Sequence, residues 1–161
     1  EDADRGGARF VVELPLANPD RAGDEAPDER RGVARALIID DEADVASSLA
    51  DMLQLMGVRA SVATEWRGAD TELEAASNPD IIFCDLRMPG FTGMQIHRSL
   101  LDFDMNYVGR FVLVTGDMLG ARIEIEQLAP ELRPHLLEKP FSMLDVRNVL
   151  ALLSDGLFSA K

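Results

Sequence analysis

At residues 81–90 the chain reads Ile-Ile-Phe-Cys-Asp-Leu-Arg-Met-Pro-Gly, an uninterrupted apolar run that ends in Asp85 and is followed by a Pro-Gly turn. A continuous apolar run of this length between turn signals is typical of a strand buried on both faces of a parallel sheet. In such sheets, ligands and chemistry lie just beyond the carboxyl ends of the strands. Asp85 is therefore a candidate functional residue.

Four further polar residues end apolar runs in the same way. Asp40 and Asp41 follow an earlier run, and Thr115 and Lys139 follow two later ones. Because the carboxyl ends of parallel strands lie at one edge of a sheet, we expect these side chains to meet near Asp85.

The chain from residue 36 onward alternates between strand and helix patterns. Strands are predicted at 36–39, 58–62, 81–85, 111–114 and 136–137, and helices around 45–56, 66–76, 94–101, 119–128 and 146–153. Ser142 with Asp145 predicts a capping box at the start of the last helix. This alternation predicts an α/β fold with a doubly wound, five-stranded parallel sheet.

The flanking segments have a different composition. Residues 1–17 hold an alternating stretch at 10–16 that predicts a single strand, which we assign to a preceding domain. Residues 18–34 are rich in Asp, Glu, Arg, Pro and Gly without apolar periodicity, which predicts a flexible linker. The main domain is expected at 35–154 with a tail at 155–161, and the start at Glu1 indicates a piece of a longer protein.

Bulk composition excludes several classes of function. A net charge of −13 disfavours binding to nucleic acid or to anionic membranes. The single cysteine cannot form an internal disulfide, which suits a reducing compartment. The sequence has no apolar run of membrane-spanning length and no signal peptide. We therefore expect a cytoplasmic domain without membrane contact.

Three carboxylates at one sheet edge would repel one another and raise at least one pKa unless a cation is present. Oxygen ligands of this kind suit Mg²⁺, which binds a few carboxylates and keeps several waters. Asp85 could then attack phosphorus as a nucleophile. Lys139 and Thr115 could bind oxygens of the transferred phosphoryl group. We expect a cis peptide at Lys139-Pro140, because the chain must turn sharply while directing Lys139 at the site.

From Ala36 to Leu153 the sequence resembles the receiver domains of two-component response regulators, which have the flavodoxin-like (βα)5 fold. Motifs at successive strand ends carry this resemblance: Ile39-Asp40-Asp41-Glu42, Asp85-Leu86-Arg87-Met88-Pro89-Gly90 with Gly93, Thr115-Gly116-Asp117, and Lys139-Pro140-Phe141. It implies that Asp85 accepts a phosphoryl group from a kinase histidine, assisted by Thr115 and Lys139.

The resemblance also implies a magnesium site. Its direct ligands would be the carboxylates of Asp41 and Asp85 and the backbone carbonyl of Arg87, with Asp40 helping through water. One position departs from the family pattern. The aromatic residue that usually lies three positions before the lysine is here Leu136. We therefore expect phosphorylation chemistry to be kept and the output route to differ.

Residues 6–15, Gly-Gly-Ala-Arg-Phe-Val-Val-Glu-Leu-Pro, resemble the closing strand of the ATP-binding domain of sensor histidine kinases, although that family commonly has Thr where Ala8 stands. Together with the linker and the receiver-like region, this resemblance implies the carboxyl-terminal part of a bacterial hybrid histidine kinase. The implied partners are a histidine-kinase phosphodonor domain and a histidine phosphotransfer protein.

Three other functions fit the sequence less well. A phosphatase of the haloacid dehalogenase type would need an acid at the position of Arg87. A non-phosphorylated interaction module would not need the complete set of acids, although Leu136 leaves room for it. Nucleotide or flavin binding would need a glycine-rich loop after the first strand, which the sequence lacks.

Four further residues are predicted to fill space rather than to bind ligands: Cys84, Trp66, His97 and His135.

Overall fold

The computed structural model describes residues 34–157. Their five strands form one parallel sheet with the order β2-β1-β3-β4-β5. The strands are β1 (Arg35–Ile39), β2 (Arg59–Ala63), β3 (Ile81–Asp85), β4 (Phe111–Thr115) and β5 (His135–Glu138). The helices are α1 (Ala43–Leu55), α2 (Ala69–Ala75), α3 (Gly93–Phe103), α4 (Met118–Glu126) and α5 (Met143–Leu157), with short 3₁₀ turns η1 (Met105–Tyr107) and η2 (Pro130–Leu132). The predicted doubly wound fold is confirmed.

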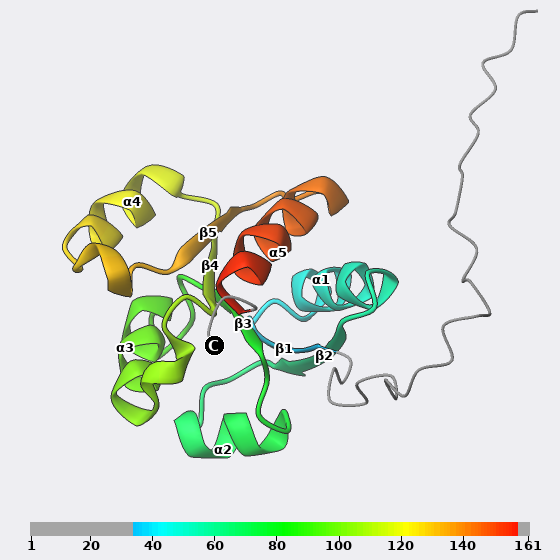
Figure 1. The fold of residues 1–161 in the computed structure, drawn as a ribbon, viewed down its shortest axis with the longest axis horizontal. Helices are drawn as coiled ribbons and strands as arrows, with labels where there is room; N and C mark the ends of the chain where they lie inside the picture. The colour runs from blue at the N-terminus through cyan, green and yellow to red at the C-terminus, as the bar shows by residue number, and fades with distance from the viewer. Residues whose placement is uncertain (1–33, 158–161) are drawn as a thin grey trace, which may run out of the picture. The chain divides into compact units, whose positions relative to one another are not determined.

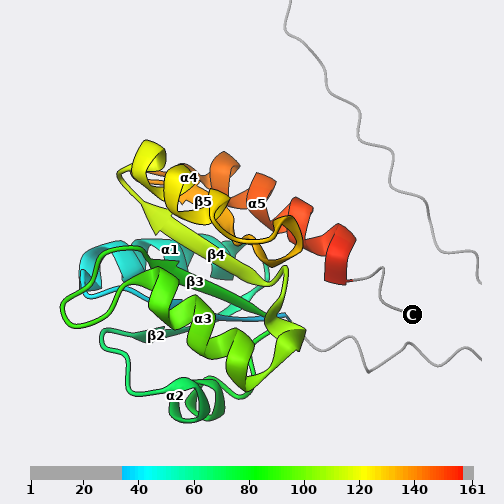
Figure 2. The same ribbon diagram turned by 90° about the vertical axis from the view of Figure 1, so that its left-hand side faces the viewer.

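The helices cover both faces of the sheet, as Figures 1 and 2 show. Helices α1 and α5 pack on one face, and α2, α3 and α4 pack on the other. Alternate residues of each inner strand enter the two cores, so that Ile38 and Phe83 face α1 and α5 while Ile39 and Ile82 face the opposite layer. This double burial explains why the strands are continuously apolar rather than alternating.

Strand β3 lies at the centre of the sheet, and all five of its residues are buried. Strand β1 has β2 on one side and β3 on the other, so the direction in which successive strands are added reverses between β1 and β3. Ile39 pairs with Cys84 in the β1–β3 register. Asp40 and Asp85, one residue further along each strand, therefore lie next to the crevice where such folds bind ligands.

The loop after β3 is held tightly against the start of α3. The Gly93 N–H donates to the Leu86 carbonyl over 2.9 Å. A Cβ at Gly93 would lie 2.6 Å from Leu113 Cδ2 and 2.7 Å from the backbone oxygen of Asp85, so only glycine fits. The Thr92 side chain caps α3 in a reciprocal capping box with Gln95. Together these contacts hold the backbone around Asp85 in one position.

Several element boundaries differ from the sequence prediction. Helix α2 begins only at Ala69, after Gly68 with φ = 124°, so Trp66 lies in the preceding loop, where it still packs against the core. Helix α4 is present as predicted, but its apolar Leu119 and Ile123 are 72% and 56% exposed. The capping box of Ser142 with Asp145 and the cis peptide at Lys139-Pro140 are both confirmed.

The predicted amino-terminal strand, most of the linker and the end of the tail lie outside the described residues, so those domain boundaries stay predictions. Within residues 34–157, no helix is both long and apolar enough to span a bilayer.

Candidate functional site

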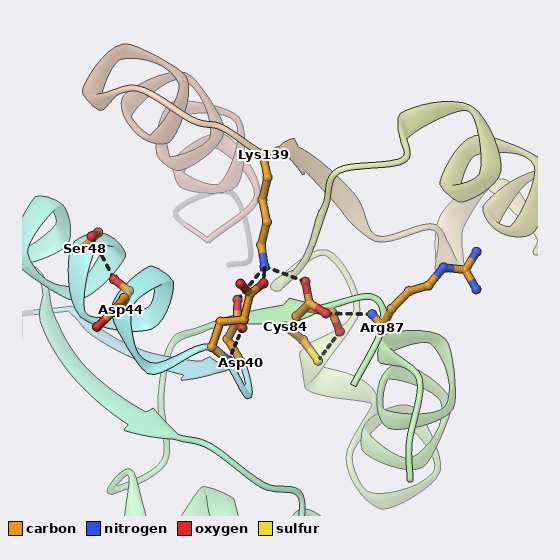
Figure 3. A network of polar contacts seen from close by, with 8 residues as sticks. Asp40, Asp44, Ser48, Cys84, Arg87 and Lys139 are labelled. Carbon is orange, nitrogen blue, oxygen red and sulfur yellow. Dashed lines mark hydrogen bonds and ion pairs between the residues drawn. The ribbon is translucent and has the colours of Figure 1, made fainter. Parts of the chain in front are cut away.

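The ammonium group of Lys139 lies among carboxylates at the carboxyl edge of the sheet. Its Nζ is 2.8 Å from Asp85 Oδ1, 2.9 Å from Asp40 Oδ2 and 3.3 Å from Glu42 Oε1. Figure 3 shows the Lys139 side chain extending from the end of β5 toward Asp40. Three strands thus place their terminal polar residues at one point, as the sequence predicts for Asp40, Asp85 and Lys139.

Backbone groups hold the other oxygen of each buried carboxylate. The Arg87 N–H donates to Asp85 Oδ2 over 2.7 Å, and the Glu42 N–H donates to Asp40 Oδ1 over 2.9 Å. Each carboxylate is therefore fixed between Lys139 and a loop amide. Lys139 is itself positioned by its own N–H, which donates to the Thr115 carbonyl over 2.8 Å.

Burial and pairing act in opposite directions on these groups. Burial raises the pKa of Asp85, and the hydrogen bonds from Lys139 and the Arg87 amide only partly offset this effect. Burial lowers the pKa of Lys139, but hydrogen bonds to Asp85 and Asp40 outweigh it, so the pKa is raised overall. Lys139 therefore stays cationic at neutral pH. Its positive charge offsets part of the free-energy cost of keeping the buried Asp85 carboxylate ionised.

Thr115 ends β4, next to β3, and is almost fully buried. Its Oγ1 accepts a hydrogen bond from the Asp117 N–H over 3.0 Å. Asp117 in turn caps α4, because its Oδ1 accepts from the Gly120 N–H over 2.9 Å. The hydroxyl is thus brought to the correct edge of the sheet, where it contacts the start of α4.

Asp41 is exposed, and in residues 34–157 its carboxylate is not one of the three that pair with Lys139. The same part of the chain contains no three His, Cys, Asp or Glu side chains already arranged as metal ligands. The donor chemistry nevertheless fits Mg²⁺, because Asp40, Asp41, Asp85 and the Arg87 carbonyl supply only oxygen atoms. The assignment of these residues as Mg²⁺ ligands rests on donor chemistry and stays a prediction.

Two contacts were not predicted from the sequence. Glu42 joins the ion-pair cluster, and the only sequence signal for it is that a third acid follows Asp40 and Asp41. The Arg87 guanidinium Nη2 lies 3.4 Å from Glu124 Oε1 on α4. These residues are 37 positions apart, so no local pattern could have joined them.

Leu136 occupies the position at which the sequence predicts a departure from the family pattern. It is partly buried and packs against the core formed with α2, α3 and α4. It also lines a cavity of about 350 Å³ between α4, β5 and α5, whose lining includes Met118 and Val149 and no aromatic residue.

Three of the residues predicted to fill space, Cys84, His97 and His135, are at least partly buried. Cys84 is fully buried, and burial, followed by the charges of Asp85 and Asp40, raises its pKa well above the usual value. His97 is buried and lies with its ring centroid 4.8 Å from that of Phe111. His135 is half-buried in β5, and burial lowers its pKa.

Comparison with known proteins identifies the class of protein to which this domain belongs. Residues 36–150 match the family model of the response regulator receiver domain, so the chain belongs to that family. It is a receiver domain of two-component signalling.

The individual relatives are of several kinds. The chain is 31% identical over 103 residues to the sensor histidine kinase AtsR of Burkholderia thailandensis, covering 58% of this chain and 16% of that protein. It is 30% identical over 82 residues to the C4-dicarboxylate transport transcriptional regulatory protein DctD of Pseudomonas aeruginosa, covering 51% and 17%. The matched regions thus span under a fifth of either relative.

Solved structures agree on the fold. The chemotaxis response regulator CheY4 of Vibrio cholerae matches with a TM-score of 0.61 at 20% identity, covering 76% of this chain and 99% of that one. The BeF3-activated DrrB receiver domain matches with a TM-score of 0.59 at 17% identity, with the same coverage. At these identities the likeness shows the receiver fold alone.

Proposed function

We propose that this receiver domain accepts a phosphoryl group on Asp85 from a phosphohistidine of a histidine kinase. The observation that carries the proposal is the fixation of the Asp85 carboxylate between Lys139 and the Arg87 N–H at the reversal of strand order. Membership of the receiver family supports it.

In the proposed reaction, a carboxylate oxygen of Asp85 forms a bond to phosphorus while the phosphorus–nitrogen bond of the donor breaks. The electron pair stays on the imidazole nitrogen of the donor, which then takes up a proton from solvent. Lys139, already beside Asp85, binds a phosphoryl oxygen and offsets its growing charge. Thr115 turns its hydroxyl from Asp117 toward a second phosphoryl oxygen.

Asp40, Asp41, Asp85 and the Arg87 carbonyl are the residues that would hold Mg²⁺, which supplies charge neutralisation for the incoming phosphoryl group when bound. Asp40 and Asp85 already face the same cation, Lys139, which can move to the phosphoryl group because its side chain keeps 17% of its surface exposed. A divalent ion bound by these residues would supply the positive charge that Lys139 provides to the two carboxylates in its absence.

Intact-mass spectrometry after incubation with acetyl phosphate and MgCl₂ tests the proposal. The wild type should gain one phosphoryl group that hydroxylamine removes, as expected for an acyl phosphate, and Asp85→Asn should gain none. Asp102→Asn, a change of an exposed acid on α3, serves as the matched control and should behave as wild type.

A phosphoryl group on Asp85→Asn would refute the assignment. If the wild type gains no mass and binds no beryllium fluoride with Mg²⁺, the domain is instead an interaction module that is not phosphorylated.

We further propose that the parent is a bacterial hybrid histidine kinase acting in the cytoplasm, with a histidine phosphotransfer protein as a further partner. The resemblance of residues 6–15 to a kinase closing strand supports this context, as does the relative named as a sensor histidine kinase. Transfer from a phosphorylated kinase core to this chain, absent with Asp85→Asn, is the expected result. Failure of transfer from every histidine-kinase core of the source genome would contradict it.

A further inference from the structure

The Arg87–Glu124 contact joins the loop that follows Asp85 to helix α4. Arg87 contacts both ends of this link: its N–H donates to Asp85 Oδ2 over 2.7 Å, and its guanidinium lies 3.4 Å from Glu124 Oε1. Figure 3 shows the Arg87 side chain directed away from Lys139 and the carboxylate cluster. A cation that sits two residues from the proposed phosphoryl acceptor is therefore engaged elsewhere.

We propose that Arg87 is a charge-operated link that releases α4 when Asp85 is phosphorylated, an inference that rests on the proposed function. A phosphoryl group adds roughly 1.5 to 2 negative charges near neutral pH. Guanidinium groups bind phosphoryl oxygens in a bidentate manner, so the new group competes with the single carboxylate contact of Glu124. Arg87 then turns toward Asp85, and Glu124 loses its partner.

The surroundings of the pair favour this motion. The Arg87 side chain is 63% exposed, so the guanidinium can turn without crossing a packed core. Its backbone, by contrast, is fixed, because Arg87 forms a β-bridge with Thr92, the residue that caps α3. The motion is thus confined to the side chain and to α4.

Helix α4 is suited to respond. In the described part of the chain it buries only Ala121 fully, so few apolar contacts hold it in place. Glu124 also lines a groove of about 560 Å³ between α3 and α4, together with Met94, Leu101 and Leu128. Release of Glu124 would change the lining of this groove, and Leu136 would not take part.

The size of the effect is bounded by the exposure of the pair. An exposed ion pair contributes at most about 1 kcal/mol, which corresponds to roughly a fivefold shift of a two-state equilibrium. The response of α4 should therefore be graded rather than complete.

The test compares amide chemical shifts of the full 161-residue chain with and without beryllium fluoride and Mg²⁺, for wild type, Glu124→Gln, Arg87→Gln and the double variant. Glu126→Gln, on an exposed residue of the same helix, is the matched control. In wild type and control, the mimic should move the amides of Met118–Glu126. Without the mimic, both single variants should already be displaced in that direction and should respond less, and the double variant should resemble either single one.

Intact mass after acetyl phosphate treatment separates the two proposals. If Asp85 gains a phosphoryl group but Glu124→Gln responds like Glu126→Gln, or α4 of the wild type does not move, the link is refuted and the acceptor role stands. If the wild type gains no phosphoryl group and binds no mimic, both proposals fail.

Discussion

Replacement of Gly93 by alanine should weaken the fold and disturb the site together. The added Cβ would lie 2.6 Å from Leu113 Cδ2 and 2.7 Å from the Asp85 backbone oxygen, against 3.4 Å for the start of ordinary contact. Leu113 is fully buried and the other atom belongs to the backbone, so neither can move easily. Overpacking of this kind costs about 1–3 kcal/mol.

Alanine also has a favourable effect, because it restricts the unfolded chain and favours helix by about 0.4–1 kcal/mol. The net loss in the free energy of unfolding should therefore be about 1–2 kcal/mol, or roughly 4–8 °C in Tm. Urea and thermal denaturation measure this loss. Phosphorylation by acetyl phosphate should also slow, since the backbone of Asp85 must shift.

Gly116→Ala is the matched control for stability. A Cβ there meets no atom within 4 Å, and the residue does not have a left-handed φ. Its stability should equal or slightly exceed that of the wild type. If Gly93→Ala proved as stable as Gly116→Ala, the close approach of α3 to the Asp85 loop would be refuted.

Four other predictions concern charge and capping. Burial lowers the pKa of His97 to about 4. The folded state therefore binds a proton on His97 less readily than the unfolded state, in which the pKa is near 6.5. The free energy of unfolding should not depend on this group above pH 6.5 and should fall by about 3 kcal/mol as the pH drops to 4. His97→Gln should flatten this dependence in urea denaturation at stepped pH, and equal slopes would contradict the assignment. Lys139→Met should lower the free energy of unfolding by about 3 kcal/mol, because Asp40 and Asp85 lose their shared cation. Millimolar MgCl₂ should restore part of the lost stability, and an unchanged urea midpoint would argue against the buried cluster. Asp85→Asn should be at least as stable as wild type, since burial raises the pKa of that carboxyl, and a clear drop in Tm would count against this reasoning. Ser142→Ala should cost about 1 kcal/mol by removing the cap of α5, with Ser48→Ala as a mid-helix comparison that should change stability less.

The strands were predictable because each is a short apolar run between turn residues. The polar residues at their ends were predictable because parallel topology places those ends at one edge. This reasoning located Asp40, Asp85 and Lys139 together, and the cis Lys139-Pro140 bond was confirmed.

What the sequence could not supply depends on tertiary packing. Leu119 and Ile123 have helical spacing, yet they face solvent, because spacing does not say which side of a helix meets the sheet. Trp66 fits the stripe of α2 but lies before the helix, whose start is set by the backbone at Gly68. The pairing of Arg87 with Glu124 depends on where α4 lies beside the β3–α3 loop, which no local pattern encodes.

The parallel sheet also gives the domain two chemically unlike ends. Asp85 and Lys139 lie where the strands finish, whereas Arg35 opens β1 at the opposite edge, and α5 runs back from β5 toward that same edge (Figure 2). Both points at which a polypeptide tether can join this domain therefore lie far from the reactive carboxylate. A module joined directly before β1 or directly after α5 would start on the side of the domain away from the acceptor edge, which leaves that edge open to a docking protein.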